Sequence, residues 1–320
     1  MATFAPDGRS VITGGLDNNV RIWDAGSLAE LRVLASRVAP LYTVALSADG
    51  RTIVSAGDSS HIRIWSGASG RELRTFSGSQ YGSNRARISP DGRTLAVAGN
   101  DLTVQLFDLE TGAERLVFRE HSGPVYGVAF SPDGRLVASS SGGDRMVRVW
   151  EAATGRELVA MRGHTKPISD VVFSPDGRLV ASAAGEGTVK VWDAATGREV
   201  VSLDAHADGA QAVAFSPDGR LLATAGADRA VRLWDTSNWR QVRALVGHQA
   251  DAKTLAFSPD GRLLASGGLD TTARLWDVAS GREEAVLRGH SRWVQEVAFA
   301  PDGRTLVSVS ADGTTRAWEV

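Results

Sequence analysis

Short stretches of alternating apolar and polar residues follow one another along the chain. From residue 255 on, four such stretches occur, LAFS, RLLAS, TARLW and REEAVLRG. They are separated by the turn sequences PDG, GGLD and DVASG. In the first turn, Pro restricts φ, Asp bonds its own backbone and Gly accepts a positive φ. The last stretch has more polar positions, as expected for a solvent-facing edge. The pattern predicts four short strands.

The same unit recurs through the chain. Successive turn aspartates are 42 residues apart except for one step of 43, and they lie at Asp7, Asp49, Asp91, Asp133, Asp176, Asp218, Asp260 and Asp302. A second mark recurs in phase, from RIWD at 21 to RAWE at 316. Short strands at this spacing are typical of an all-β sandwich, barrel or propeller, and the fixed period favours a propeller with one blade per repeat.

Eight repeats fill the chain and leave no residues for a second domain. We expect a single β-propeller over residues 1–320, with repeats at approximately 1–35, 36–78, 79–120, 121–163, 164–205, 206–247, 248–289 and 290–320. The alternative is seven blades with one leftover repeat. The eighth repeat ends at TTRAWEV, its third strand, so the last blade should lack its outer strand.

The unit resembles a WD40 repeat, because it combines a Gly-His pair, as at Gly289-His290, the hairpin, and Trp-Asp, as at Trp276-Asp277. The resemblance covers the whole chain, and its Arg-rich style is similar to that of bacterial WD40 proteins. It implies an all-β, eight-bladed WD40 β-propeller. Such propellers are interaction platforms, often fused to kinases or nucleotide-binding ATPases.

The resemblance also implies a buried hydrogen-bond tetrad of His, Ser or Thr, Asp and Trp in each blade. One such set alone could be mistaken for a catalytic triad, but an enzyme needs one triad, whereas every blade needs its own tetrad. We therefore expect a structural role and no catalytic residues. The sets are His121, Ser139, Asp144, Trp150; His206, Thr224, Asp228, Trp234; His248, Ser266, Asp270, Trp276; and His290, Ser308, Asp312, Trp318.

The tetrad decays toward the N-terminus. Glu186 replaces Asp in the fifth repeat, Val97 and Phe107 replace the hydroxyl and the indole in the third, and Arg37 occupies the His position in the second. Either these repeats drifted because their packing tolerates it, or the surface there is remodelled for a partner.

Composition excludes several classes of function. The chain has 320 residues, a net charge of −2 and no cysteine, which rules out disulfides and thiolate metal sites. No signal peptide or membrane-length apolar run is visible, so we expect a cytoplasmic protein without a membrane partner. Arginines recur at repeat positions, which argues against a nucleic-acid partner. Phosphate-loop, dinucleotide and zinc motifs are missing from the sequence, so no cofactor or metal is predicted.

A partner-binding face is implied by the resemblance, on the side that carries the loops between blades. Trp293 stands out there because the repeat does not require it, and exposed aromatic residues are typical hot spots. Leu16, Tyr42, Leu269 and Trp293 would form an apolar patch if the ring closes; alternatively, each packs on its own loop. The predicted face residues are Leu16, Tyr42, Tyr126, Gln211, Asp251, Lys253, Leu269, Trp293 and Gln295.

These features predict a non-enzymatic scaffold that binds a protein or peptide. The alternative is a regulatory or sensor module cut from a larger signalling protein, such as a kinase or a nucleotide-binding ATPase. The least favoured hypothesis is a propeller hydrolase or lyase. The third strand of the eighth repeat would have an open edge, for which there are three alternatives. Either the sequence is a fragment whose native neighbour supplies the strand, or two copies pair through residues 314–320, or the eighth blade has three strands.

Overall fold

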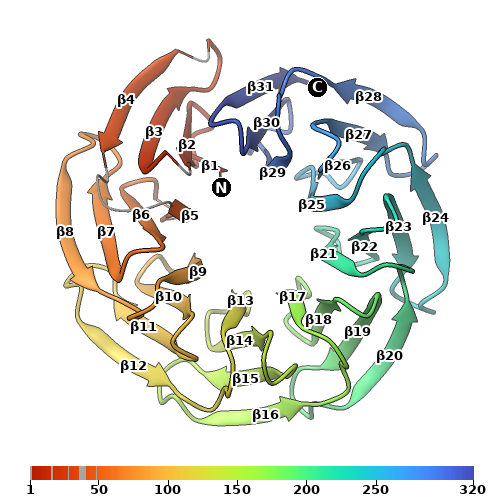
Figure 1. Ribbon diagram of the computed structural model, residues 1–320, viewed down its shortest axis with the longest axis horizontal. Coiled ribbons are helices and arrows are strands. Elements are labelled where there is room, and N and C mark those ends of the chain that lie inside the picture. The colour runs from red at the N-terminus through yellow and green to blue at the C-terminus, as the bar shows by residue number, and fades with distance from the viewer. Residues whose placement is uncertain (1, 16, 28, 36–40, 48) are drawn as a thin grey trace. The chain divides into compact units, whose positions relative to one another are not determined.

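The computed structural model describes residues 2–15, 17–27, 29–35, 41–47 and 49–320. The described chain forms antiparallel β-sheets, one per repeat, so the expected all-β fold with eight blades is confirmed (Figure 1). No helix in the described residues is long and apolar enough to cross a membrane. The chain divides into two compact units, residues 1–160 (unit 1) and 161–320 (unit 2). Each unit is described by itself, and a single propeller over residues 1–320 stays a prediction.

Unit 1 contains blades 1 to 4, each a sheet of four strands in chain order. The strands are β1 (Ala2–Phe4), β2 (Ser10–Gly14), β3 (Asn19–Asp24), β4 (Glu30–Ala35); β5 (Leu41–Leu46), β6 (Thr52–Gly57), β7 (His61–Ser66), β8 (Glu72–Ser77); β9 (Ser83–Ile88), β10 (Thr94–Gly99), β11 (Val104–Asp108), β12 (Glu114–Phe118); and β13 (Val125–Phe130), β14 (Leu136–Ser141), β15 (Val147–Glu151), β16 (Glu157–Met161).

Unit 2 contains blades 5 to 8, and among the described residues the last of these has three strands, as the sequence predicts. The strands are β17 (Ile168–Phe173), β18 (Leu179–Ala184), β19 (Thr188–Asp193), β20 (Glu199–Asp204); β21 (Ala210–Phe215), β22 (Leu221–Gly226), β23 (Ala230–Asp235), β24 (Gln241–Val246); β25 (Ala252–Phe257), β26 (Leu263–Gly268), β27 (Ala273–Asp277), β28 (Glu283–Leu287); and β29 (Val294–Phe299), β30 (Thr305–Ser310), β31 (Thr315–Glu319).

The turn between the first two strands of a blade is closed by its own side chains. In blade 4, the Ser131 hydroxyl donates to Asp133 Oδ1 at 2.6 Å, and the same carboxylate oxygen accepts the Arg135 N–H at 3.0 Å. Gly134 has a φ of 71°, a conformation that favours glycine. The repeated Ser-Pro-Asp-Gly-Arg sequence is therefore the chemistry of one tight turn.

The core lies between neighbouring blades of a unit. Second strands such as β26 are buried on both faces, which explains why they consist almost entirely of apolar or small residues. Between blades 6 and 7, Leu233, Leu245, Leu264 and Trp276 form one buried cluster. Full burial of a large apolar side chain contributes about 1.5–3 kcal/mol. Neighbouring first strands also contact each other, as β5, β9 and β13 do, and this contact brings their ends together.

Candidate interaction face

A β-bulge near the start of the first strand determines the direction of one side chain in blades 2 to 8. In β13, Val125 pairs with Ser141 and Gly127 with Ser140, so Tyr126 is left out of the ladder. A bulge of this kind re-aims the extra residue. Because first strands of a unit run side by side in the same direction, the bulged residues form a row at one end of each unit. The row contains Tyr42, Asn84, Tyr126, Ser169, Gln211, Lys253 and Gln295.

Two bulged residues of unit 1 are tyrosines with exposed rings. Tyr42 is 38% exposed and Tyr126 is 40% exposed. The Tyr42 hydroxyl donates to Asp58 Oδ2 at 2.8 Å, and this hydrogen bond raises the pKa of Tyr42. The Tyr126 ring lies over Gly142, where an added Cβ would stand 2.2 Å from ring atom Cε2. Only glycine at position 142 leaves room for the Tyr126 ring, because any side chain there would overlap it.

Between these tyrosines, blade 3 provides an amide network and a third tyrosine. The Asn84 amide donates to Asn100 Oδ1 at 2.7 Å and to the Val125 carbonyl at 2.9 Å. Asn100 in turn donates to the carbonyl of Tyr81 at 3.0 Å, which ties the Tyr81 loop to the same end of the blade. Tyr81 is 66% exposed. Sequence reasoning missed Tyr81 and Asn84, although the chain has only three tyrosines and all of them lie here.

Among the predicted residues of blades 6 and 7, in unit 2, Gln211, Asp251 and Lys253 are half-buried, whereas Leu269 is exposed. Lys253 Nζ donates to Gln211 Oε1 at 2.8 Å, and both side chains are half-buried. Burial lowers the pKa of Lys253, while the negative charge of Asp251 acts in the opposite direction. The Asp251 carbonyl accepts the N–H of Leu269 at 2.8 Å, and Leu269 is 38% exposed.

In blade 8, Trp293 and Gln295 are half-buried. The Trp293 carbonyl accepts the N–H of Ala311 at 3.0 Å, so its backbone forms part of the loop-to-turn contact. Leu16 lies outside the described residues. The apolar patch predicted from repeats 1, 2, 7 and 8 has members in both units, and it stays a prediction.

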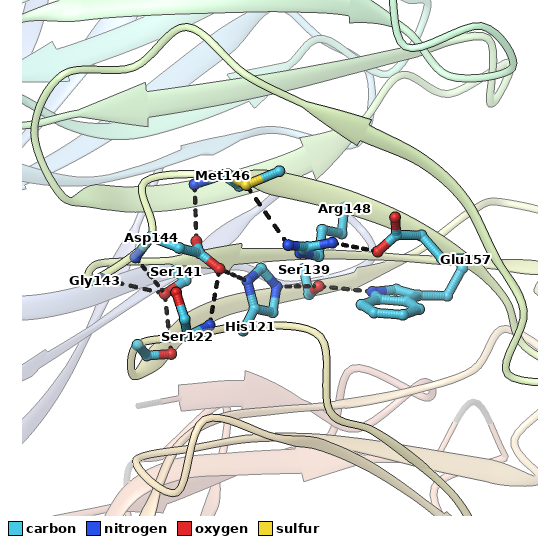
Figure 2. A network of polar contacts seen from close by, with 11 residues as sticks. His121, Ser122, Ser139, Ser141, Gly143, Asp144, Met146, Arg148 and Glu157 are labelled. Atoms are coloured by element: carbon cyan, nitrogen blue, oxygen red, sulfur yellow. Dashed lines mark hydrogen bonds and ion pairs between the residues drawn. The ribbon is translucent and has the colours of Figure 1, made fainter.

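The predicted tetrad of blade 4 forms a continuous hydrogen-bonded chain (Figure 2). His121 Nδ1 lies 2.8 Å from Asp144 Oδ2, and His121 Nε2 lies 2.8 Å from Ser139 Oγ. The Trp150 indole N–H donates to the same Ser139 oxygen at 2.8 Å. When Nδ1–H donates to the carboxylate, Nε2 accepts the serine O–H, so every polar group has a partner.

The negative charge of this network lies on the carboxylate of Asp144. Burial would raise the pKa of Asp144, but hydrogen bonds from His121 and from the N–H groups of Met146 and Ser122 outweigh burial and lower the pKa to about 2. Ser139 has no exposed surface, and its hydroxyl is already bonded on both sides. A substrate could not reach this hydroxyl without unfolding the blade around it.

The structure brings together the other three predicted tetrads as well, and a fifth in which Glu186 takes the place of Asp. Across these four sets, His Nδ1 lies 2.5–3.2 Å from the carboxylate, His Nε2 lies 2.7–3.0 Å from the hydroxyl, and the indole donates at 2.8–3.1 Å. Burial lowers the pKa of His164, His206 and His290.

Blades 1 to 3 keep fewer of these contacts. Trp23 still donates to Thr13 Oγ1 at 2.8 Å, and Trp65 donates to Ser55 Oγ at 2.9 Å. In blade 3 the Phe107 ring packs on Phe76, with ring centroids 4.7 Å apart. Arg37, which occupies the His position of the second repeat, lies outside the described residues. Within the described part of the chain, no group of three or more His, Asp or Glu side chains could hold a metal ion.

Comparisons with known proteins agree with this geometry. The family model for the WD domain, G-beta repeat (WD40), matches residues 1–24, 30–66, 70–108, 112–151, 155–193, 197–235, 239–277 and 281–319. No curated protein matches the chain. The solved structures it resembles include the crystal structure of the computationally designed Ika8 protein, at 27% identity and a TM-score of 0.88, over 98% of this chain and 93% of that one. Eight matched segments cover nearly all of the sequence, and the chain therefore belongs to the WD40 repeat family.

Proposed function

We propose that this protein is a non-enzymatic platform for a protein or peptide partner, and that the partner contacts the tyrosine face of unit 1. We define this face by Tyr42, Tyr81 and Tyr126. The observation that carries the proposal is that all three tyrosines of the chain are exposed at the same end of three successive blades. Tyrosine offers a large, rigid contact area and a hydroxyl at a low entropic cost, which suits a binding surface.

The tetrads support a non-enzymatic role. A serine nucleophile must reach its substrate, whereas the tetrad hydroxyls are buried and share their hydrogen bonds with His and Trp. The same arrangement recurs in five blades, where it links the loop before the first strand to the second and third strands. These contacts support a structural role for the tetrads, and a hydrolase or lyase function has no corresponding support.

The arginines after the turns support a protein partner over a nucleic acid. Arg51, Arg178 and Arg220 are exposed, but each belongs to a different blade and has a turn aspartate within about 4 Å. Charges distributed in this way, one per repeat, do not form a continuous basic patch. We keep a cytoplasmic location and a bacterial source as predictions from the sequence.

The tyrosine face can be tested without knowing the natural partner. A peptide-display library is selected against the whole chain, and the affinities of the selected peptides are then measured for Tyr126→Ala and Tyr81→Ala. We expect each substitution to weaken binding by about 2 kcal/mol, roughly thirty-fold. Leu269→Ala is the matched control, because Leu269 has the same exposure as Tyr42 but lies in unit 2. Peptides that bind the tyrosine variants normally and lose affinity only for Leu269→Ala would contradict the proposal.

A further inference from the structure

The turn between the second and third strands of a blade carries an acidic residue, and in most blades hydrogen bonds within the blade occupy its carboxylate. In blade 3, Asp101 accepts the N–H and the hydroxyl of Thr103 and the N–H of Gln80. The aspartates that a histidine and backbone N–H groups hold in the same way are Asp144, Asp228, Asp270 and Asp312. Such a carboxylate stabilises its own blade and has little capacity left for a partner.

Asp58 of blade 2 differs from these aspartates, because it comes one residue earlier in its turn. Its side chain is exposed. Within the described part of the chain, one group donates to its carboxylate, the Tyr42 hydroxyl, which lies 2.8 Å from Oδ2. Oδ1 accepts no hydrogen bond from a described donor. Asp58 is therefore an exposed carboxylate that is oriented by a tyrosine and still has an oxygen to offer.

The loop of blade 3 that carries Tyr81 lies directly against this turn. An added Cβ on Gly82 would stand 3.0 Å from Asp58 Cα and 3.0 Å from the Gly57 carbonyl oxygen. The Gly82 carbonyl accepts the N–H of Asn100 at 3.1 Å, which attaches the loop to its own blade. Tyr81, the neighbour of Gly82, is the most exposed tyrosine of the chain, at 66%. Two exposed tyrosines and one exposed carboxylate therefore lie close together at the junction of blades 2 and 3.

The described loop and turn segments at this junction are acidic. Residues 57–61 (GDSSH), 78–82 (GSQYG) and 99–103 (GNDLT) contain two aspartates and neither lysine nor arginine. In blade 4, by contrast, the equivalent segments contain Arg119 and Arg145. A partner that reaches the junction of blades 2 and 3 meets aromatic rings and negative charge, and this combination favours a cation.

We propose that Tyr42, Asp58 and Tyr81 form a binding site for an arginine side chain of the partner, and we call it the arginine site. It rests on the proposed function, because it names the chemistry that the tyrosine face recognises. A guanidinium can donate to Asp58 Oδ1 while its flat face lies against a tyrosine ring. An ammonium can pair with the carboxylate but has no flat face to stack, so arginine binds more tightly than lysine.

The two kinds of contact act together at this site. An exposed ion pair contributes little by itself, because water and salt screen it. An exposed contact between a cation and an aromatic ring is also weak. Since Asp58 and the rings surround one position, the same guanidinium makes both contacts and loses its freedom once. The arginine site thus selects the partner and sets its register, and the rest of the tyrosine face adds contact area.

The proposal is tested by titrating the whole chain with N-acetyl-arginine amide and following the backbone amide NMR signals of Asp58, Ser59, Tyr81 and Gly82. The matched control compound is N-acetyl-citrulline amide, which has the same size and a flat end group but no charge. We expect the arginine compound to shift these signals saturably and to bind about ten-fold more tightly than the citrulline compound. N-acetyl-lysine amide should bind less tightly than the arginine compound. Added salt should weaken the binding of both charged compounds.

Three variants link this binding to the site. Asp58→Asn keeps an acceptor for the Tyr42 hydroxyl but removes the charge, so it should bind the arginine compound no better than the citrulline compound. Asp49→Asn is the matched control, because it removes the same charge from the turn at the other end of β6, and it should bind like the unmodified chain. Tyr81→Leu should weaken the binding of the arginine compound about three-fold.

Four results would overturn the arginine site. They are equal binding of the arginine and citrulline compounds, equal binding of the arginine and lysine compounds, undiminished binding to Asp58→Asn, and no saturable shift at tens of millimolar. The selected peptides separate this proposal from the proposed function. Peptides that need Tyr81 and Tyr126 but bind Asp58→Asn normally would support the tyrosine face and overturn the arginine site. Peptides that bind independently of the tyrosines would contradict the proposed function, whereas the titration tests the arginine site without them.

Discussion

Replacing Asp270 with alanine removes a carboxylate that accepts four hydrogen bonds. Oδ2 accepts from His248 Nδ1 at 3.0 Å and from the Gln249 N–H at 2.8 Å. Oδ1 accepts from the N–H of Thr272 at 3.1 Å and from its hydroxyl at 2.8 Å. The carboxylate therefore links the loop before the first strand to the turn before the third.

The expected loss follows from which donors stay buried. His248 and Thr272 are buried, whereas Gln249 is exposed and its N–H can turn to water. A stranded buried donor costs about 1–3 kcal/mol. Two such groups, at about 1.5 kcal/mol each, give an expected decrease of about 3 kcal/mol in the free energy of unfolding.

Asp101 in blade 3 is the matched control. It lies at the same position in its turn and accepts from the N–H and the hydroxyl of Thr103, at 3.2 and 2.7 Å, but Ser79 replaces the histidine. Asp101→Ala should therefore cost about 1.5 kcal/mol, half as much, because only one buried residue loses its acceptor. Urea denaturation measures the global loss, and native-state hydrogen exchange at the Thr272 and Thr103 amides measures the loss in each blade.

Equal losses for Asp270→Ala and Asp101→Ala would refute the reasoning, because the histidine would then contribute nothing through the carboxylate. An unchanged unfolding free energy for Asp270→Ala would refute it more broadly. That result would mean that the tetrad is not a stabilising network.

Three further predictions concern the same contacts and the packing between blades. Below pH 6.5 the free energy of unfolding should decrease as the pH falls, because the unfolded chain binds protons at His164, His206 and His290, whose pKa burial lowers in the folded chain. Asp144, whose pKa is lowered from 3.8 to about 2, adds a further decrease between about pH 4 and pH 2. Urea midpoints that stay constant from pH 8 to pH 4 would contradict this. Gly142→Ala should displace the Tyr126 ring and cost roughly 1–2 kcal/mol, and unshifted ring-proton NMR signals would show that the contact is absent. Leu46→Phe should fill part of the 640 Å³ crevice between blades 1 and 2, since six other blades have Phe at this position, and it should add about 1 kcal/mol to the free energy of unfolding. A lower melting temperature would exclude this packing.

The sequence predicts the blades because their chemistry is local and repeated. The turn at Asp133 needs only the Ser, Gly and Arg that surround it, and all of them recur at a fixed spacing. The tetrads could be assigned by position for a related reason. Their members are separated by nearly constant intervals, so one aligned repeat identifies the equivalent residues in the others.

The candidate face was only partly predictable. Tyr42 and Tyr126 were identified by position, but the bulge that turns them outward depends on how the first strand pairs with the second. The seat of the Tyr126 ring on Gly142, and the amide network from Asn84 to the Tyr81 loop, join residues that are 16 to 19 positions apart. The contact spans 16 residues in each of these blades, from Tyr42 to Asp58, from Asn84 to Asn100 and from Tyr126 to Gly142. The residue types differ from blade to blade, so the sequence pattern does not reveal these contacts.

The sequence by itself determined the number of repeats, the strand order within them and the residues of each tetrad, because these follow from local turn chemistry and a strict period. The tertiary structure alone decided which side chains are exposed and which polar groups have partners. Arg316 illustrates the difference. Its position in the repeat predicts an arginine on a third strand, but only the packed blade shows that its guanidinium lies against Gly289, where an added Cβ would stand 2.8 Å from Nη1. Burial and pairing depend on every neighbour of a group, and most neighbours of a buried side chain are distant in the sequence.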